Sequence, residues 1–228
     1  MAKPDNAYGQ YCPMVRAVEV LGERWTLLIL RDMLVGVNRF NDLARGLPGL
    51  SRTLLTKRLR QLERTGIVTR SEGQYLLTDA GRDLEPLVFG IGEWGARWMF
   101  DEPRPDELDA ELLVWWMHSR INTPVLPSDR TVIHIRFSDD PRLFWLLVES
   151  RKASVCLVDP GFEVDVTVRT DVPTLYEVWL GRRPLLSAVR GGDVALEGNR
   201  DLVRLMPEVL QLSPMAELVS TTRGVPPS

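Results

Sequence analysis

The segment SRTLLTKRLRQLERTGIVTR, residues 51–70, carries cationic and hydroxyl side chains at a spacing that could bind a polyanion. Four leucines recur at the spacing of one helix face, namely Leu54, Leu55, Leu59 and Leu62. The opposite face is left with polar side chains, namely Arg52, Thr53, Thr56, Lys57, Arg60 and Arg64. Such a face is either an ordinary solvated surface or one that lies against phosphates.

Charge is distributed unevenly along the chain of 228 residues, whose net charge is −3. Residues 1–100 hold 14 Lys and Arg against 11 Asp and Glu, a net charge of +3. The remaining residues hold 14 against 20, a net charge of −6. Between residues 39 and 70 there are eight cations and two anions. This separation predicts a polyanionic partner for the first half of the chain.

The elements that must position the cationic face can be located by their apolar periodicity and their end signals. Residues 13–34 read as two helices separated by Gly22, and NDLARGL reads as a short helix that ends at Gly46. The following LPGL must be a turn, because proline and glycine both break helices. Ser51 is a good N-cap for the basic helix, and Gly66 is placed to end it.

A hairpin and a further helix follow the basic helix. IVTRSEGQYLLT reads as two short strands joined by a tight turn at Glu72 and Gly73. Thr78 is predicted to cap one continuous helix that runs to Met99, with Pro86 in its first turns or at a kink.

A short helix, a turn, a capped basic helix and a hairpin together predict a winged helix-turn-helix. A helix enters the major groove of DNA when one face is committed to the protein and the other is free to approach bases and phosphates. The predicted contacts with double-stranded DNA are Arg39, Ser51, Arg52, Thr53, Thr56, Lys57, Arg60, Arg70 and Gln74. Winged helices also serve as protein-interaction modules, which is the alternative reading.

Residues 12–98 resemble the HxlR family of bacterial winged-helix regulators. The resemblance is carried by Cys12-Pro13, by LGERWTLLILRDML, by RFNDLARGLPGLSRTLLTKRLRQLERTGIVTR and by YLLTDAG. It implies a homodimer, in which the first and last helices pack together and two recognition helices meet a roughly palindromic operator. The segment RSEGQYLLT is shorter than is usual for the family, so we expect a wing of reduced reach.

The same resemblance gives candidate residues for the dimer interface and for redox sensing. The candidate dimer residues are Val15, Val18, Trp94 and Trp98. The two tryptophans could equally belong to the core of their own domain. In some members of the family the cysteine that matches Cys12 is a redox sensor, so the sequence leaves Cys12 as either a sensor or a passive, packed thiol.

The sequence shows no motif for binding a cofactor or a metal and no segment that would span a membrane. The two cysteines, Cys12 and Cys156, are far apart and form no metal-ligand spacing, which fits a reducing compartment. No apolar run approaches the ~18 residues of a membrane span. The first residues lack the apolar core of a signal peptide. We therefore expect a cytoplasmic protein with no cofactor and no bound metal.

The acidic, proline-containing stretch FDEPRPDELD indicates a boundary between a domain at residues 1–103 and a second at 104–228. Beyond it, alternating or apolar runs predict strands at TVIHIRF, FWLLVES, SVCLVD and FEVDVTVRT, flanked by helices. The predicted fold class is α+β, a winged helix-turn-helix domain followed by a mixed-sheet domain.

The second half, from Phe162 to Leu212, resembles the sterol-carrier-protein type of lipid-binding fold. That resemblance implies an apolar cavity, for which the candidate lining residues are Trp116, Phe137, Trp145 and Trp179. Each of these aromatic residues could instead belong to a filled core. The two histidines, His118 and His134, have no neighbouring acidic or cysteine partner in sequence, so no catalytic residue is predicted.

These observations predict a transcriptional regulator and not an enzyme. The first hypothesis is a homodimeric repressor that binds DNA and responds to a hydrophobic small-molecule effector. The alternative is a carrier or enzyme for an apolar small molecule, with the winged helix as a protein-docking module. A third reading makes the second half a dimerisation and solubility module with a filled core.

Overall fold

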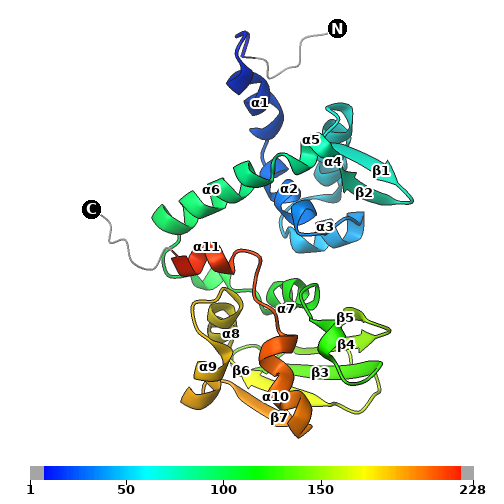
Figure 1. Ribbon diagram of the computed structural model, residues 1–228, viewed down its shortest axis with the longest axis vertical. Helices are drawn as coiled ribbons and strands as arrows, with labels where there is room; N and C mark the ends of the chain where they lie inside the picture. The colour runs from blue at the N-terminus through cyan, green and yellow to red at the C-terminus, as the bar shows by residue number, and fades with distance from the viewer. Residues whose placement is uncertain (1–7, 222–228) are drawn as a thin grey trace. The chain divides into compact units, whose positions relative to one another are not determined.

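The computed structural model describes residues 8–221, and it divides into two compact units, one up to Gly92 and one from Glu93 onward (Figure 1). The division falls within helix α6, and the predicted boundary at residue 103 stays a prediction. The elements up to α6 are α1 (Pro13–Leu21), α2 (Thr26–Leu34), α3 (Phe40–Gly46), α4 (Arg52–Arg64), β1 (Val68–Ser71), β2 (Gln74–Leu77), α5 (Asp79–Arg82) and α6 (Glu85–Trp98).

The core of the first unit forms around one face of α4. Leu55, Leu59 and Leu62 are buried and pack with apolar residues of α2 and α3. The turn between α3 and α4 passes through Gly49, whose φ of 83° favours glycine. Leu47 and Leu50, which flank this turn, are also buried. The predicted pair of helices joined by a Pro-Gly turn is therefore present.

The wing is a two-residue hairpin, as the sequence predicts. Glu72 and Gly73 both have positive φ, at 50° and 76°, which matches the turn that the twist of two antiparallel strands favours. The backbone N–H of Tyr75 donates to the carbonyl of Asn38 at 2.8 Å, and the Tyr75 side chain is buried. This bond ties β2 to the segment that leads into α3.

The helix predicted after the wing is two helices. Thr78 caps α5 as expected, because its Oγ1 accepts from the N–H of Gly81. The helix is interrupted by a turn at Asp83 and Leu84, and α6 begins at Glu85 with Pro86 in its first turn. The prediction of one continuous helix was therefore wrong. Proline lacks a backbone N–H and its ring crowds the preceding turn, so Pro86 is favoured in the first turn of a helix, where α6 has it, over a helix interior.

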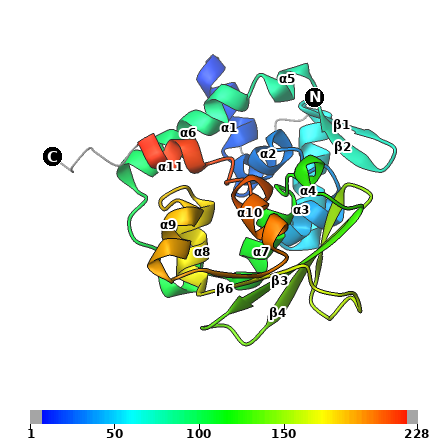
Figure 2. The ribbon, with the colours of Figure 1, turned by 60° about the horizontal axis from the view of Figure 1, so that its bottom comes forward.

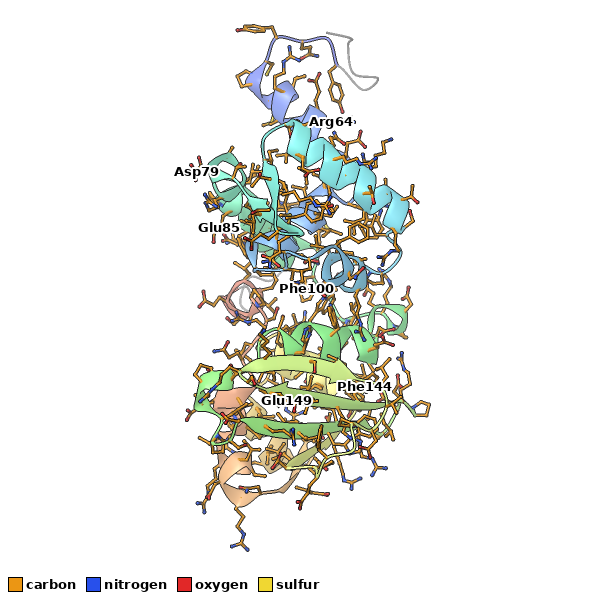
Figure 3. All side chains as sticks on the ribbon, turned by 90° about the vertical axis from the view of Figure 1, so that its right-hand side faces the viewer. Arg64, Asp79, Glu85, Phe100, Phe144 and Glu149 are labelled. Carbon is orange, nitrogen blue, oxygen red and sulfur yellow. The ribbon has the colours of Figure 1, made fainter. Side chains whose placement is uncertain are left out.

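The second unit is built on a mixed five-stranded sheet in the order β5-β4-β3-β6-β7. Only the β3–β6 pair is parallel, and the other pairs are antiparallel. In Figure 3 the labels Phe144 and Glu149 mark the course of β4. The elements are η1 (Pro105–Glu107), α7 (Ala110–His118), η2 (Thr123–Val125), β3 (Arg130–Phe137), β4 (Leu143–Glu149), β5 (Lys152–Cys156), β6 (Val166–Thr170), α8 (Val172–Trp179), α9 (Leu185–Gly191), β7 (Ala195–Gly198), α10 (Arg200–Val209) and α11 (Ala216–Thr221).

Helices α7, α8 and α10 lie on one side of this sheet (Figure 2). The inward-facing residues of the strands join the helices in one hydrophobic core, which includes Ile135, Phe144 and Val168. The mixed sheet confirms the predicted mixture of helices and strands in this half. Among the described residues, 8–221, the structure contains no helix of the length and apolarity that crossing a membrane requires.

Two predicted strands are shorter than the sequence suggested. SVCLVD pairs only as far as Cys156, and FEVDVTVRT pairs only from Val166. Between them Asp159 Oδ1 accepts from the N–H of Gly161 at 2.8 Å, which makes a local turn. Just before β6, Asp165 bonds Val132 twice, because its backbone N–H donates to the Val132 carbonyl at 3.0 Å and its Oδ2 accepts from the Val132 N–H at 2.8 Å.

Candidate nucleic-acid interface

The N-terminus of α4 has a side-chain cap, and its first residues are exposed to solvent. Ser51 has extended backbone angles, and its Oγ accepts from the N–H of Leu54 at 3.2 Å. The first turn contains no acidic residue, so the positive end of the helix dipole is not offset by a carboxylate within the helix. This end of α4 therefore favours an approaching anion.

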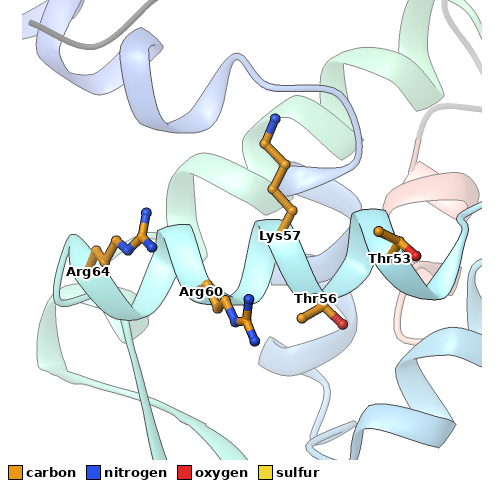
Figure 4. A pocket seen from close by; sticks show the side chains of 5 residues that line it. All are labelled: Thr53, Thr56, Lys57, Arg60 and Arg64. Carbon is orange, nitrogen blue, oxygen red and sulfur yellow. The ribbon is translucent and has the colours of Figure 1, made fainter.

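One face of α4 lines a surface hollow of about 410 Å³. Figure 4 shows the five side chains that line it, and all of them project from α4: Thr53, Thr56, Lys57, Arg60 and Arg64. Four of the five are exposed, and Thr56 is half-buried. The structure thus brings together four of the predicted contacts and adds Arg64, which lies on the predicted face but was not among the predicted contact residues.

Arg52 behaves differently from the other cations of α4, because its guanidinium turns toward α3. Its Nη2 donates to Asn41 Oδ1 at 2.6 Å. Its guanidinium carbon lies 4.8 Å from the centre of the Phe40 ring, which is a cation–π arrangement. Sequence reasoning missed this contact, because the two partners lie eleven and twelve residues away.

Arg58 is the cation of α4 that is buried. Its Nη2 lies 2.6 Å from Glu23 Oε2, and its Nε donates to the carbonyl of Arg24 at 3.1 Å. Its Nη1 donates to Gln61 Oε1 at 3.2 Å. These bonds tie the middle of α4 to the segment between α1 and α2. Arg58 is thus a structural residue, and it is not available to a partner on the exposed face.

The remaining predicted DNA contacts lie at the start of α3 and in the wing. Arg39 is the exposed N-cap of α3. Arg70 is exposed on β1, with its guanidinium carbon 5.6 Å from the centre of the Tyr75 ring. Gln74 is half-buried at the start of β2. No described contact joins these three side chains to the hollow on α4, and their role stays a prediction.

The candidate dimer residues lie on helices that expose apolar surface. None of the nine residues of α1 is buried, and Val15 is half-buried while Val18 is exposed. Val88 is the buried residue of α6, whereas Trp94 and Trp98 are 55% and 48% exposed. The alternative that the two tryptophans belong to the core of their own unit does not fit this exposure.

Cys12 is the half-buried N-cap of α1, and its side chain makes no capping hydrogen bond. Cys156 is half-buried at the end of β5, and both cysteines are free thiols. Within residues 8–221 no three His, Cys, Asp or Glu side chains are grouped as metal ligands. A sensing role for Cys12 stays a prediction.

The four aromatic candidates for a ligand cavity do not share one side of the sheet. Phe137 and Trp179 are buried in the same hydrophobic core, and Trp116 packs against it. Trp145 is also buried but alternates with Phe144 along β4, so it lies on the opposite face of the sheet. There it stacks on His134, with ring centroids 4.7 Å apart and planes 3° from parallel.

The capped helix, the turn and the two-stranded wing define a winged helix-turn-helix protein, the class that binds DNA through its second helix. The model of the HxlR-like helix-turn-helix family matches residues 20–103. A transcriptional regulator of Synechocystis, sll1512, is 35% identical over 108 residues, which cover 44% of this chain and 80% of that protein. The chain belongs to the HxlR family of helix-turn-helix transcriptional regulators.

Other relatives share the same region. The HTH-type transcriptional regulator Rv3095 of Mycobacterium tuberculosis is 44% identical over 98 residues, which are 40% of this chain. The match spans only 60% of that relative's length. The crystal structure of the quinone-bound YodB from B. subtilis is 33% identical, and the match covers 38% of this chain and all of that chain with a TM-score of 0.36. The named relatives are transcriptional regulators and not enzymes.

The His134 ring carries a buried Nε2 with no hydrogen-bond partner among the described residues. Burial lowers the pKa of His134 below its ordinary value of 6.5, and Arg136 and Arg169 lower it further, against a smaller opposing effect of Asp159. As the pH falls through 6.5, the unfolded chain therefore binds a proton before the folded chain does, and the free energy of unfolding decreases.

We expect the substitution His134→Phe to keep the stack on Trp145 and to remove the unpaired nitrogen. The free energy of unfolding at neutral pH should increase by about 1 kcal/mol. Its decrease between about pH 7 and pH 5 should become shallower than in the wild type. Chemical unfolding of both proteins across this range measures the two effects, and superimposable pH profiles would contradict a lowered pKa of His134 in the folded protein.

Proposed function

We propose that the protein is a homodimeric repressor that binds a roughly palindromic operator through α4. The observation that carries the proposal is the division of α4 into a buried leucine face and an uncovered face with Thr53, Thr56, Lys57 and Arg60. A helix of this kind can present hydroxyl and cationic groups to base edges and phosphates at once. Arg39, Arg70 and Gln74 would add contacts from the start of α3 and from the wing.

Binding to double-stranded DNA should depend strongly on salt. A dimer that contacts ~8–10 phosphates should show a log–log slope of affinity against salt near −7 to −9. Lys57→Ala and Arg60→Ala should each weaken binding at least ~10-fold, since each is lost twice in a dimer. Lys152→Ala, which removes an exposed lysine from β5, is the matched control and should bind normally. Fluorescence anisotropy over a salt series measures these values, and a wild-type slope near zero would refute the proposal.

The homodimer is proposed from the apolar surface that α1 and α6 leave uncovered. Met14 of α1 is 70% exposed, and α6 exposes Ile91 together with Trp94 and Trp98. Exposed apolar surface of this kind can serve as an association site. Two recognition helices related by a twofold axis would then require a palindromic site.

Charge placed on these helices should dissociate the dimer without unfolding the chain. We expect Val18→Glu and Trp98→Glu to lower the sedimentation mass from that of a dimer to that of a monomer, because a carboxylate cannot be buried unpaired. Leu186→Glu is the matched control, since Leu186 is 53% exposed on α9 and outside both helices. Analytical ultracentrifugation would contradict the proposal if wild type and variants sediment alike.

The effector is proposed to be a hydrophobic small molecule bound in the second unit, as the sterol-carrier-type resemblance implies. Phe137 and Trp179 in the core, with Trp116 beside them, supply the aromatic surface for it. Regulation requires that the effector bind the DNA-competent and incompetent states with different affinity.

A matching apolar ligand should stabilise the protein and change its affinity for DNA. A panel of fatty acids and sterols tested by thermal unfolding should contain a member that, at ~100 times its Kd, adds about 2.7 kcal/mol to the unfolding free energy. Trp179→Ala should remove this response, whereas Trp145→Ala, on the other face of the sheet, should keep it. A panel without any responding member would favour the reading of a filled core.

A further inference from the structure

Arg52 is the first residue of α4, and Asn41 and Phe40 are the first two residues of α3. The side chains of Arg52 and Asn41 are exposed, yet the guanidinium is held from two sides. Asn41 Oδ1 accepts from its Nη2 at 2.6 Å, and the Phe40 ring lies 4.8 Å from its central carbon. The first turn of α4 is thereby joined to the first turn of α3.

These two contacts restrict what the guanidinium can reach. An unrestrained arginine explores many rotamers and loses that freedom when it binds. One N–H of Arg52 is used by Asn41, and the planar group keeps further donors in a fixed fork that matches the oxygens of a phosphate. A guanidinium held against α3 cannot extend along α4 toward a base edge. Its remaining donors lie at the start of two helices, where the backbone of DNA would pass.

The neighbouring residues of α4 differ from Arg52 in the groups that they leave free for a partner. Thr56 Oγ1 donates to the carbonyl of Arg52 at 2.9 Å, so its hydroxyl oxygen can only accept from a partner. Thr53, Thr56 and Lys57 line the hollow of α4, whereas Arg52 does not. The groups that remain for base edges are therefore separate from the group that is held on α3.

We propose that Asn41 is a positioning residue, which with Phe40 holds the Arg52 guanidinium as a phosphate clamp that carries no sequence information. This rests on the DNA-binding role of α4 proposed above. Phosphate contacts fix the position of a protein on the duplex, and base contacts select the sequence. Arg52 thus contributes affinity for any duplex, and Asn41 raises that affinity by preorganisation.

A double-mutant cycle in the full chain tests this proposal. Wild type, Asn41→Ala, Arg52→Ala and the double variant are titrated with a duplex selected from a random pool and with a scrambled duplex. Arg52→Ala should weaken both complexes by the same factor and make the salt slope shallower by about 0.9 per protomer. Asn41→Ala should weaken both by about 3- to 10-fold with the slope unchanged, and should have no further effect once Arg52 is absent.

Asn41→Asp gives a second readout, in which the salt slope changes as well as the affinity. It keeps the acceptor oxygen that holds Arg52 but places a negative charge beside it, so both affinity and salt slope should fall to the level of Arg52→Ala. A loss from Asn41→Ala that persists in the Arg52→Ala background would overturn the positioning role. So would a loss confined to the selected duplex, which would make Arg52 or Asn41 a base reader.

The cycle separates this proposal from the function on which it rests. If the wild type shows a salt slope near zero and Lys57→Ala binds like the wild type, the DNA-binding role of α4 itself fails. If those two measurements come out as expected and the effects of Asn41→Ala and Arg52→Ala are simply additive, only the positioning role fails. Unchanged thermal midpoints of all variants show that neither result comes from unfolding.

Discussion

The first unit depends on the burial of one face of α4. Leu55, Leu59 and Leu62 are removed from water, and burial of each such side chain stabilises the fold by roughly 1.5–3 kcal/mol. Because these leucines fix the rotation of the helix about its axis, they also determine which residues face outward. The cations on the other face cannot be buried without a partner, so they remain in water. The packing of the leucine face thus determines which cations of α4 are exposed.

Arg58 shows what burial of a cation on this helix requires. The structure satisfies its guanidinium three times, with the carboxylate of Glu23, the carbonyl of Arg24 and the amide of Gln61. A buried ion pair of this kind adds little net stability, because desolvation offsets most of the attraction. It does fix where α4 lies against the end of α1. Since the bonds have direction, they restrain the register of the helix in a way that leucine contacts do not.

The sequence predicted the parts of this fold that depend on local chemistry. Ser51 as a cap, Gly66 as a terminator and the Glu72-Gly73 turn each follow from the conformational preference of one or two residues. The sequence could not predict contacts between residues that lie far apart in the chain. The contact of the Arg52 guanidinium with Asn41 and Phe40 is one of these. The pairing of Asp165 with Val132, through both the backbone N–H and the side chain of Asp165 just before β6 begins, is another.

The tryptophans show why composition alone could not separate core from surface. Trp145 and Trp179 are buried, whereas Trp94 and Trp98 remain about half exposed on α6. All four have the same hydrophobicity, so the difference comes from the partners that the fold supplies. Trp145 on β4 and Trp179 on α8 are covered by their neighbours, whereas α6 buries only Val88 among the described residues. Burying such surface by association would stabilise the protein, and in the proposed homodimer a second copy of the same chain would supply the complementary surface by symmetry.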